Sequence, residues 1–575
     1  MHENIKPFTG DATNPTQFDE ASFGLAFSNS VIEHLFTCVN QPSMPSEIQR
    51  VGNAFWVQAP NCWFPMEPHF LVPGWHWMLV SLSSIRSATS EGWQLSEPQH
   101  LRFGGGVAES ALNPFVFVVI LIVGALILFG PRCRAIAPFI AASILTPMDQ
   151  VLVIGGLHFP MLRFLALFGI ARLIREKISS KSQVFRGINK IDVAVMLFAT
   201  STAAAGVVLF QQSSALVFQL GNVYTIFGVY FLLRFLIRSE EDITVMIRTL
   251  AYVAILIAIS MSWEVTTNHN PFALLGGARA SDYATLMERD NRIRAQGCFG
   301  HPLLAGTFGA VLIPLFVQLW RQGRSNRLIA VAGIISATVI TLTSNSSTPV
   351  LAYAAGVLAL CLWPLRTSMR IFRWGIILTA FTLHLVMKAP VWNLIARIDI
   401  SGGSSSYHRF MLIDECIHHF GDWWFVGVKS TADWGWSMWD TANQYVGICD
   451  NSGLLPFILF LAIIVYGFKY LGKARRAAND RKQQIFAWAL GATLFANVVA
   501  FFGISYWDQT QVVWYGLLAA ISAVSVIRPN RESTQIPTQL TSNRIQFVES
   551  DVEIEQESIE TAPPIQSRTQ RFFKI

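Results

Sequence analysis

Residues 289–321 read RDNRIRAQGCFGHPLLAGTFGAVLIPLFVQLWR, an arginine-rich polar segment that passes at Pro302 into a long apolar run. The run over 303–320 contains no charged side chain, and its length approaches the roughly 20 residues that cross a bilayer as a helix. Polar residues held beside a bilayer are costly, so a chain that keeps them there usually uses them. The stretch therefore predicts a membrane-spanning helix with a functional segment at its start.

The composition extends this interpretation to the whole chain. Of the 575 residues, 52% are hydrophobic and only 14% are charged, whereas roughly one quarter is charged in a typical soluble domain. Many other apolar runs approach the spanning length, so we expect an all-α, polytopic bundle of about 12–13 transmembrane spans. The net charge of +6 indicates no nucleic-acid partner, since Lys and Arg cluster in short connections between the spans.

The expected spans follow one another closely along the chain. They cover residues 114–130, 136–157, 160–176, 191–210, 219–237, 243–264, 303–320, 327–344, 348–365, 372–388, 453–471, 484–504 and 509–527. Basic residues cluster after every second span, which orients those connections toward the cytoplasm. Two long polar loops, at about 265–302 and 388–452, are then expected on the outer face.

Residues 114–527 are expected to form one transmembrane domain between two ends of different character. Residues 1–113 are rich in Trp, Pro and Ser, and we interpret them as an atypical N-terminal extension with little order. Residues 528–575 are polar and lack the apolar side chains needed to bury a core, which predicts a disordered cytoplasmic tail.

The first outer loop carries Arg292 and Arg294, which point the same way in an extended segment because they alternate. Two guanidinium groups that converge on one place suit a diphosphate, whose oxygens accept bidentate hydrogen bonds from Arg. His301 follows at the membrane surface. The alternative is that the two arginines pair with neighbouring carboxylates or with lipid headgroups.

The second outer loop contains apolar residues at helical spacing from Tyr407 onward, which predicts a helix lying on the membrane with Ser406 as its N-cap. Arg409 falls in its first turn. Asp414 and His418 are four residues apart, so they share a face and the carboxylate can tune the imidazole. The alternative is a solvated helix face with ordinary ion pairs.

The segment that leads into the span at 453–471 offers further polar groups. Asp440 is a candidate base, and Asn443 and Gln444 are candidates for binding hydroxyl groups. Trp424 belongs to a group of loop tryptophans that either anchor at the interface or stack on sugar faces. Seven scattered cysteines without a CxxC pair argue against a zinc site or a disulfide framework, although a bridge among the loop cysteines stays open.

Several stretches together resemble a known family. They are RIRAQGCFGHPLLAGTFGA at 292–310, Arg409 with WWFVGV at 423–428, Asn443 with Gly453, SSTPVLAYAAG at 346–356 and WPLRTSMRIFRW at 363–374. Over roughly 114–527 the chain resembles the O-antigen ligase and polymerase family of polytopic membrane glycosyltransferases. Ala442 stands where that family has a histidine, so Asp440 or a loop histidine is expected in its place.

The resemblance implies transfer of a glycan from undecaprenyl diphosphate to a hydroxyl group of lipid A-core or of a growing polysaccharide. It places the reaction at the periplasmic face of the bacterial inner membrane and among membrane lipids, and it implies no metal and no cofactor. The leaving diphosphate needs cations, which Arg292, Arg294 and Arg409 would supply. Ligase and polymerase use the same donor and are not distinguished by these motifs.

The remaining roles concern the acceptor. Its hydroxyl group needs a base, for which Asp440, His301 and His418 are the candidates. Asn443, Gln444 and Trp424 would bind the acceptor or the glycan.

A transporter or flippase for lipid-linked glycan is the main alternative of another class. Such folds often have repeated halves and charged residues near the membrane midplane. Asp149 is the clearest acid inside an expected span, but the sequence shows no convincing internal repeat. A third possibility is a sensor or scaffold, which the charged, histidine-containing outer loops disfavour because they do not look like folded domains.

Overall fold

The computed structural model describes residues 26–29, 50, 55–58, 112–147, 150–154, 157–179, 187–276, 287–289, 292–387, 389–397, 405–435, 437–507 and 509–526. The chain separates into two compact units, Met1–His100 and Leu101–Ile575. The described residues of the first unit include two short parallel strands, β1 (Ala26–Asn29) and β2 (Phe55–Gln58). Most of the expected extension at 1–113 and all of the expected tail at 528–575 lie outside the described residues.

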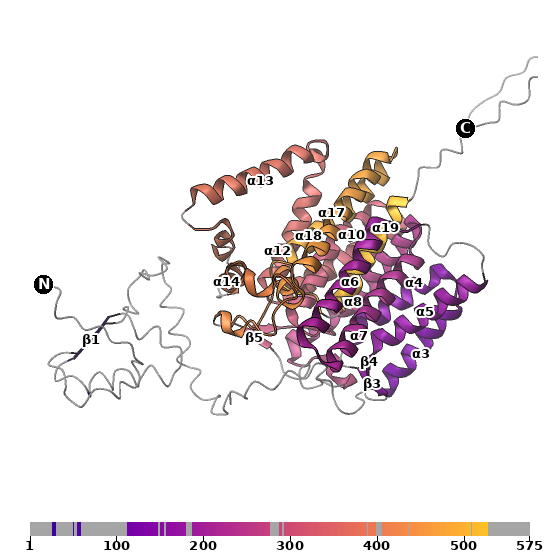
Figure 1. Cartoon of the computed structure of the whole chain (residues 1–575). Helices are drawn as coiled ribbons and strands as arrows, with labels where there is room; N and C mark the ends of the chain where they lie inside the picture. The colour runs from indigo at the N-terminus through magenta and orange to yellow at the C-terminus, as the bar shows by residue number, and fades with distance from the viewer. Residues whose placement is uncertain are drawn as a thin grey trace, which may run out of the picture. The chain divides into compact units, whose positions relative to one another are not determined.

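The second unit is built from α-helices (Figure 1). They are α3 (Pro114–Phe129), α4 (Arg132–Leu145), α5 (Met161–Ser179), α6 (Lys190–Phe210), α7 (Ser213–Leu236), α8 (Glu240–Thr267), α10 (Pro302–Arg321), α11 (Arg324–Thr343), α12 (Ser347–Cys361), α13 (Met369–Val386), α14 (Ser405–His418), α15 (Phe420–Trp423), α16 (Gln444–Ser452), α17 (Leu454–Ala477), α18 (Arg481–Ala500) and α19 (Thr510–Val526). Short 3-10 helices connect some of them: η3 (Pro271–Leu275), η4 (Trp363–Thr367), η5 (Val391–Arg397) and η6 (Ala432–Trp434).

Within the described part of the chain, eight helices are long and apolar enough to cross a membrane: α6, α7, α8, α10, α11, α13, α17 and α18. Three shorter apolar helices accompany them, at Pro114–Phe129, Ser347–Cys361 and Thr510–Ser525. These findings confirm the expected all-α class and give the chain the helices of a multi-pass membrane protein. The number of spans and the two outer-face loops stay predictions.

Capping residues fix where two of the long helices begin. Asn189 caps α6 and Ser239 caps α8, and in each case an Asp three residues later completes a capping box. The helices therefore start one residue (α6) and three residues (α8) before the apolar runs that predicted them.

The expected span at 136–157 is wrong in its second half. α4 ends at Leu145, and β3 (Val151–Ile154) pairs in antiparallel fashion with β4 (Leu157–Pro160). Thr146 precedes Pro147 and is extended, as steric contact with a proline ring favours. The run Val-Leu-Val-Ile that follows has high β-propensity, so an apolar stretch of this length forms a hairpin instead of a longer helix.

α10 lies at the centre of the bundle. Of its apolar window 83% is buried, and it packs against α8, α11, α12 and α18. The close approach to α11 depends on a small residue, because a Cβ added to Gly309 would lie 2.7 Å from the carbonyl oxygen of Ala337. Since α10 begins at Pro302, this packing also fixes the position of His301.

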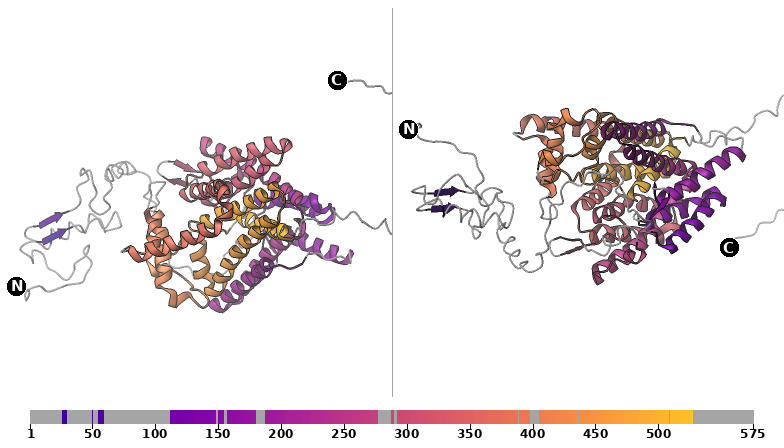
Figure 2. Two further views of the ribbon diagram at one scale, coloured as in Figure 1. Left: turned by 90° about the horizontal axis from the view of Figure 1, so that it is seen from above. Right: turned by 60° about the horizontal axis from the view of Figure 1, so that its bottom comes forward.

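Helices far apart in the sequence lie side by side. α17 packs against α6 and α19 packs against α7, so the yellow end of the described chain lies among the purple helices in Figure 2. The segment 501–509 between α18 and α19 is thereby brought to the early helices.

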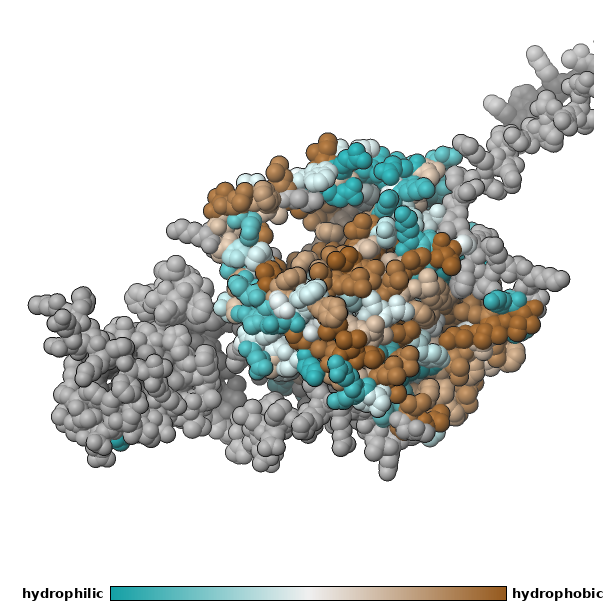
Figure 3. Space-filling view, viewed as in Figure 1, coloured by the Kyte–Doolittle hydropathy of each residue, from teal (hydrophilic) through white to brown (hydrophobic). Residues whose placement is uncertain are grey.

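The flanks of the bundle are apolar (Figure 3). On α3, for example, Phe115 is 68% exposed and Ile122 is 57% exposed. Soluble monomers rarely expose continuous apolar areas of this extent, so the flanks have the character of a lipid-facing surface.

Candidate functional site

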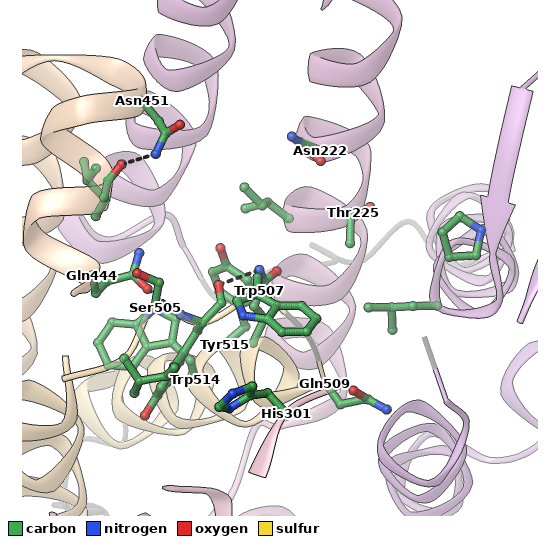
Figure 4. A pocket seen from close by; sticks show the side chains of 18 of the residues that line it. Asn222, Thr225, His301, Gln444, Asn451, Ser505, Trp507, Gln509, Trp514 and Tyr515 are labelled. Carbon is green, nitrogen blue, oxygen red and sulfur yellow. Dashed lines mark hydrogen bonds between the residues drawn. The ribbon is translucent and has the colours of Figure 1, made fainter. Parts of the chain in front are cut away.

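A cavity of about 700 Å³, with several polar side chains in a mostly apolar lining, lies between α5, α7, α16 and the 501–509 segment. Its volume falls in the range of roughly 300–1,000 Å³ that is typical of ligand sites. In Figure 4, Asn222 and Thr225 project from α7. Gln444 and Asn451 of α16 lie opposite, with Trp507 between the two sets.

His301 reaches this cavity from the N-terminus of α10. Its Nδ1 accepts a hydrogen bond from the Leu303 amide at 3.1 Å, which caps the helix. Burial, and after it the positive charge of Arg294, lower the pKa of His301 to about 4, so the ring is neutral at ordinary pH. Since Nδ1 is the acceptor, the proton of the neutral ring sits on Nε2, and His301 offers the cavity a hydrogen-bond donor.

The turn before His301 is held by a buried carboxylate that sequence reasoning missed. Glu264, near the end of α8, accepts hydrogen bonds from the amides of Gln296 at 3.1 Å and Gly297 at 2.9 Å. Gly297 has a φ of 59°, and its carbonyl oxygen accepts from Asn270 at 2.8 Å. The carboxyl group of Glu264 thus holds, through these hydrogen bonds, the turn that carries His301 into the cavity.

Of the three candidates Asp440, Asn443 and Gln444, the first and the last line the cavity, and Asn443 lies behind them. Asp440 is exposed and lines the cavity. Asn443 is fully buried, and its Oδ1 caps α16 by accepting from the amides of Tyr445 and Val446 at 3.0 and 3.2 Å. Gln444 lines the cavity, and its side-chain Oε1 accepts a hydrogen bond from the backbone amide of Tyr506 at 2.7 Å.

This wall is tied to the connection between α18 and α19. The backbone amide of Gln444 donates a hydrogen bond to the carbonyl oxygen of Phe501 at 2.8 Å. The side-chain Nδ2 of Asn443 donates to the carbonyl oxygen of Phe502 at 3.4 Å. The side chain of Asn443 therefore forms its hydrogen bonds within the protein, whereas Asp440 and Gln444 line the cavity.

Arg163 is a cation in the cavity wall that sequence reasoning did not identify. Its Nη1 donates to the carbonyl oxygen of His158 at 2.8 Å, and its Nε lies 3.3 Å from Thr225 Oγ1. No Asp or Glu of the described ranges forms an ion pair with it. The signal was present, since an arginine at the start of an apolar span is costly unless it has a role.

Arg294 and Arg409 meet at the N-terminus of α12, although they come from the two different expected loops. Arg294 Nη2 donates to Ser346 Oγ at 2.7 Å, and Arg409 Nη2 lies 3.3 Å from the neighbouring Ser347 Oγ. Ser346 is the N-cap of α12, where the helix dipole adds partial positive charge. The result is a region that favours an anion on electrostatic grounds.

The two arginines adjoin the cavity but do not line it. A Cβ added to Gly503 would lie 3.1 Å from Arg409 Nε, so the 501–509 segment contacts the arginine pair as well as the cavity. The effect of Arg294 on the pKa of His301 shows the same proximity. Arg292, exposed on β6 (Arg292–Arg294), is not brought to this pair by any contact that the described residues make.

His418 and Trp424 lie outside the cavity. The expected helix is confirmed as α14, but Ser406 lies inside it, so the N-cap prediction is wrong. His418 Nδ1 is 3.6 Å from Asp414 Oδ2 on a face where the imidazole is 67% exposed. Trp424 is 50% exposed.

Asp450 of α16 is a buried acid beside the cavity-lining Asn451. Neither of its carboxylate oxygens has a hydrogen-bond partner among the described residues. Burial raises the pKa of Asp450 to about 7. The neighbouring Cys449 is also buried, and a hydrogen bond with the thiol of Cys416 and burial raise the pKa of Cys449.

Metal ligands do not gather in the described ranges, where no three His, Cys, Asp or Glu side chains come together. Comparison with family models gives no match to this chain, and comparison with curated proteins gives none. The cavity and the arginine pair are therefore the features of the structure that bear on function.

Proposed function

We propose that this chain is a metal-independent membrane glycosyltransferase of the O-antigen ligase or polymerase type. It would transfer glycan from undecaprenyl diphosphate to a hydroxyl group of lipid A-core or of a growing polysaccharide, in a bacterial inner membrane with the cavity facing the periplasm. The observation that carries the proposal is the meeting of Arg294 and Arg409 at the start of α12, beside a cavity lined by Asp440 and His301.

The reaction class needs a cationic site for its leaving group. The acceptor oxygen attacks the anomeric carbon, and the bond between that carbon and the diphosphate oxygen breaks with its electron pair on the diphosphate. Guanidinium groups that are already in place stabilise this charge without supplying a proton. Arg294 and Arg409 would hold the diphosphate at the end of α12, where the helix dipole adds to their effect.

The acceptor hydroxyl group must lose its proton as the new bond forms. Asp440 is the carboxylate that lines the cavity, and it would take this proton as general base. His301, with its proton on Nε2, would donate a hydrogen bond to the diphosphate or to a sugar oxygen. In this arrangement neither His418 nor Arg292 takes part in the reaction.

The side chains in the remaining walls of the cavity are of the kinds that bind sugars. Trp439, Trp507 and Trp514 line it together with amide side chains such as Asn222 and Gln444. Aromatic rings can stack on sugar faces while amides bind hydroxyl groups. Arg163 adds a positive charge on the side of α5.

Reconstitution tests the proposal. The full chain in nanodiscs receives undecaprenyl-diphosphate glycan with and without lipid A-core, in the presence of a chelator. Product that requires the core acceptor indicates a ligase, and longer lipid-linked glycan without it indicates a polymerase. Unchanged donor in both arms, together with movement of labelled donor across a liposome membrane, would replace the proposal by the transporter or flippase.

Matched variants link the outcome to the arginine pair. Arg294→Ala and Arg409→Ala are expected to lose transfer, whereas Arg327→Ala, an exposed arginine near the start of α11, keeps it. Full activity in both variants of the pair would remove the diphosphate site from the proposal.

A further inference from the structure

A second large hollow lies between α12, α13, α17 and α18, with a volume of about 930 Å³. Its walls are mainly apolar and include Phe468, Leu471, Trp488 and Phe495. It lies near the C-terminal ends of α12 and α17, whereas the first cavity and the arginine pair lie at the opposite ends of these helices. The hollow is therefore separate from the proposed donor site.

Basic side chains surround one end of this hollow. They are Arg366, Arg370, Arg373, Lys469, Arg475 and Arg476. No Asp or Glu lines the hollow, and none in the described ranges forms an ion pair with any of the six. Positive charge thus stands at the rim of an apolar space, and no anion of the described residues balances it.

Aromatic rings hold two of these arginines in place. The guanidinium carbon of Arg366 lies 4.6 Å from the centre of the Trp363 ring, and that of Arg475 lies 5.8 Å from the centre of the Trp488 ring. Trp363 and Trp488 pack edge to face at 5.7 Å, and Trp488 Nε1 donates to the carbonyl oxygen of Ala359 at 2.9 Å. Part of the basic rim is therefore organised before any ligand arrives.

α13 forms the outer wall, and the described part of the chain does not cover it. No residue in its apolar window is buried, and Ile376, which lines the hollow, is 54% exposed. Figures 1 and 3 show α13 set off from the bundle by an open space. Arg370 and Arg373 are three residues apart, so they project from one face of the helix toward the rim.

We infer that this hollow binds an anionic phospholipid, with its acyl chains along the apolar walls and its phosphate group at the basic rim. The charge is complementary, and basic pockets between transmembrane helices are suited to acidic headgroups. A free anion would satisfy the rim but would leave the apolar walls uncovered. The inference does not depend on the proposed glycan transfer.

Native mass spectrometry of the full chain tests the inference. The protein is released from nanodiscs that contain equal amounts of phosphatidylglycerol and phosphatidylcholine with the same acyl chains. We expect one phosphatidylglycerol to stay bound in preference to phosphatidylcholine. Arg370→Ala with Arg373→Ala should weaken that preference by about thirtyfold, since each basic residue near an acidic membrane surface contributes about fivefold and the two factors multiply.

The control pair is Arg324→Ala with Arg327→Ala. These residues are also arginines three apart on one exposed helix, α11, but they do not line the hollow. The control should retain the lipid as the unmodified chain does. Equal retention of both lipids, or equal loss in the control, would mean unspecific annular lipid and would overturn the inference.

A third variant separates a lipid from a simple anion. Gly472 lines the hollow, and a Cβ added to it would meet nothing within 4 Å. Gly472→Leu should therefore place apolar atoms in the acyl space from a Cβ that meets no neighbour, and release the lipid while all six basic residues remain. Unchanged lipid retention in this variant, or displacement of the lipid by millimolar inorganic phosphate, would show an anion site without acyl binding and would contradict the inference.

Discussion

The guanidinium group of Arg163 occupies the space that a side chain at Gly221 would need. A Cβ added to Gly221 would lie 2.5 Å from Nη2 of Arg163 and 2.7 Å from its Cζ. The glycine on α7 therefore lets the arginine on α5 lie flat against the neighbouring helix and reach the carbonyl oxygen of His158. In this way a residue without a side chain determines where a positive charge stands in the cavity.

Gly221→Ala should displace Arg163 and lower glycan transfer by about a hundredfold, since one preorganised donor is moved from its site. The helix itself gains about 1 kcal/mol from the higher propensity of alanine, so the protein should remain folded. Gly472→Ala is the control, because a Cβ there meets nothing within 4 Å. Transfer assays with both variants check this, and equal activity would remove Arg163 from the site.

If the proposed reaction holds, Arg294→Ala and Arg409→Ala should each reduce transfer by about 100- to 1,000-fold, because each removes a cation that would stabilise the leaving diphosphate. The double variant should lose less than the product of the two factors, since both residues act at adjacent serines of one helix end. Single-turnover transfer in nanodiscs measures this. Factors that simply multiply would indicate two independent sites.

His301 should make the protein less stable in acid. The pKa of His301 is about 4 in the folded chain and about 6.5 when unfolded, so the unfolded state binds a proton first as pH falls. Stability contributed by the neutral ring is complete above about pH 6.5 and is lost toward pH 4, by roughly 3 kcal/mol. His301→Asn keeps a capping side chain without titrating. Thermal unfolding in detergent at pH 4.5 and pH 7 should show a smaller difference for this variant.

Asp450 should make the protein less stable as pH rises, the opposite of the effect of His301. Its pKa is about 7 in the folded chain and near 3.8 when unfolded, so the unfolded state loses the proton first as pH rises. Stability is then lost between about pH 4 and pH 7, by roughly 4 kcal/mol. Asp450→Asn removes the charge and should unfold at a higher temperature than the unmodified chain at pH 8, with little difference at pH 4. Lower stability of the variant at pH 8 would show that Asp450 is charged and paired.

The helices could be predicted because a long apolar run in a membrane can pair its backbone N–H and C=O groups in few ways other than as a helix. The expected helix at 136–157 is the exception, because the chain leaves the helix before Pro147 and a short run rich in β-branched residues follows. The spacing of apolar residues alone does not show whether such a run forms a helix or a strand. The nearness of Arg294 to Arg409 was suggested by residue type and position beside spans. Arg163 and Asp450 were missed, because their surroundings come from helices distant in the sequence.

Asn443 and Gln444 are bonded to the 501–506 segment before any ligand is present. The conformational entropy of ordering this wall is therefore lost during folding and not at the moment of binding. In the proposed reaction, a sugar would therefore be selected at this wall by its fit to a surface whose shape is already fixed, and not by closure of the protein around it.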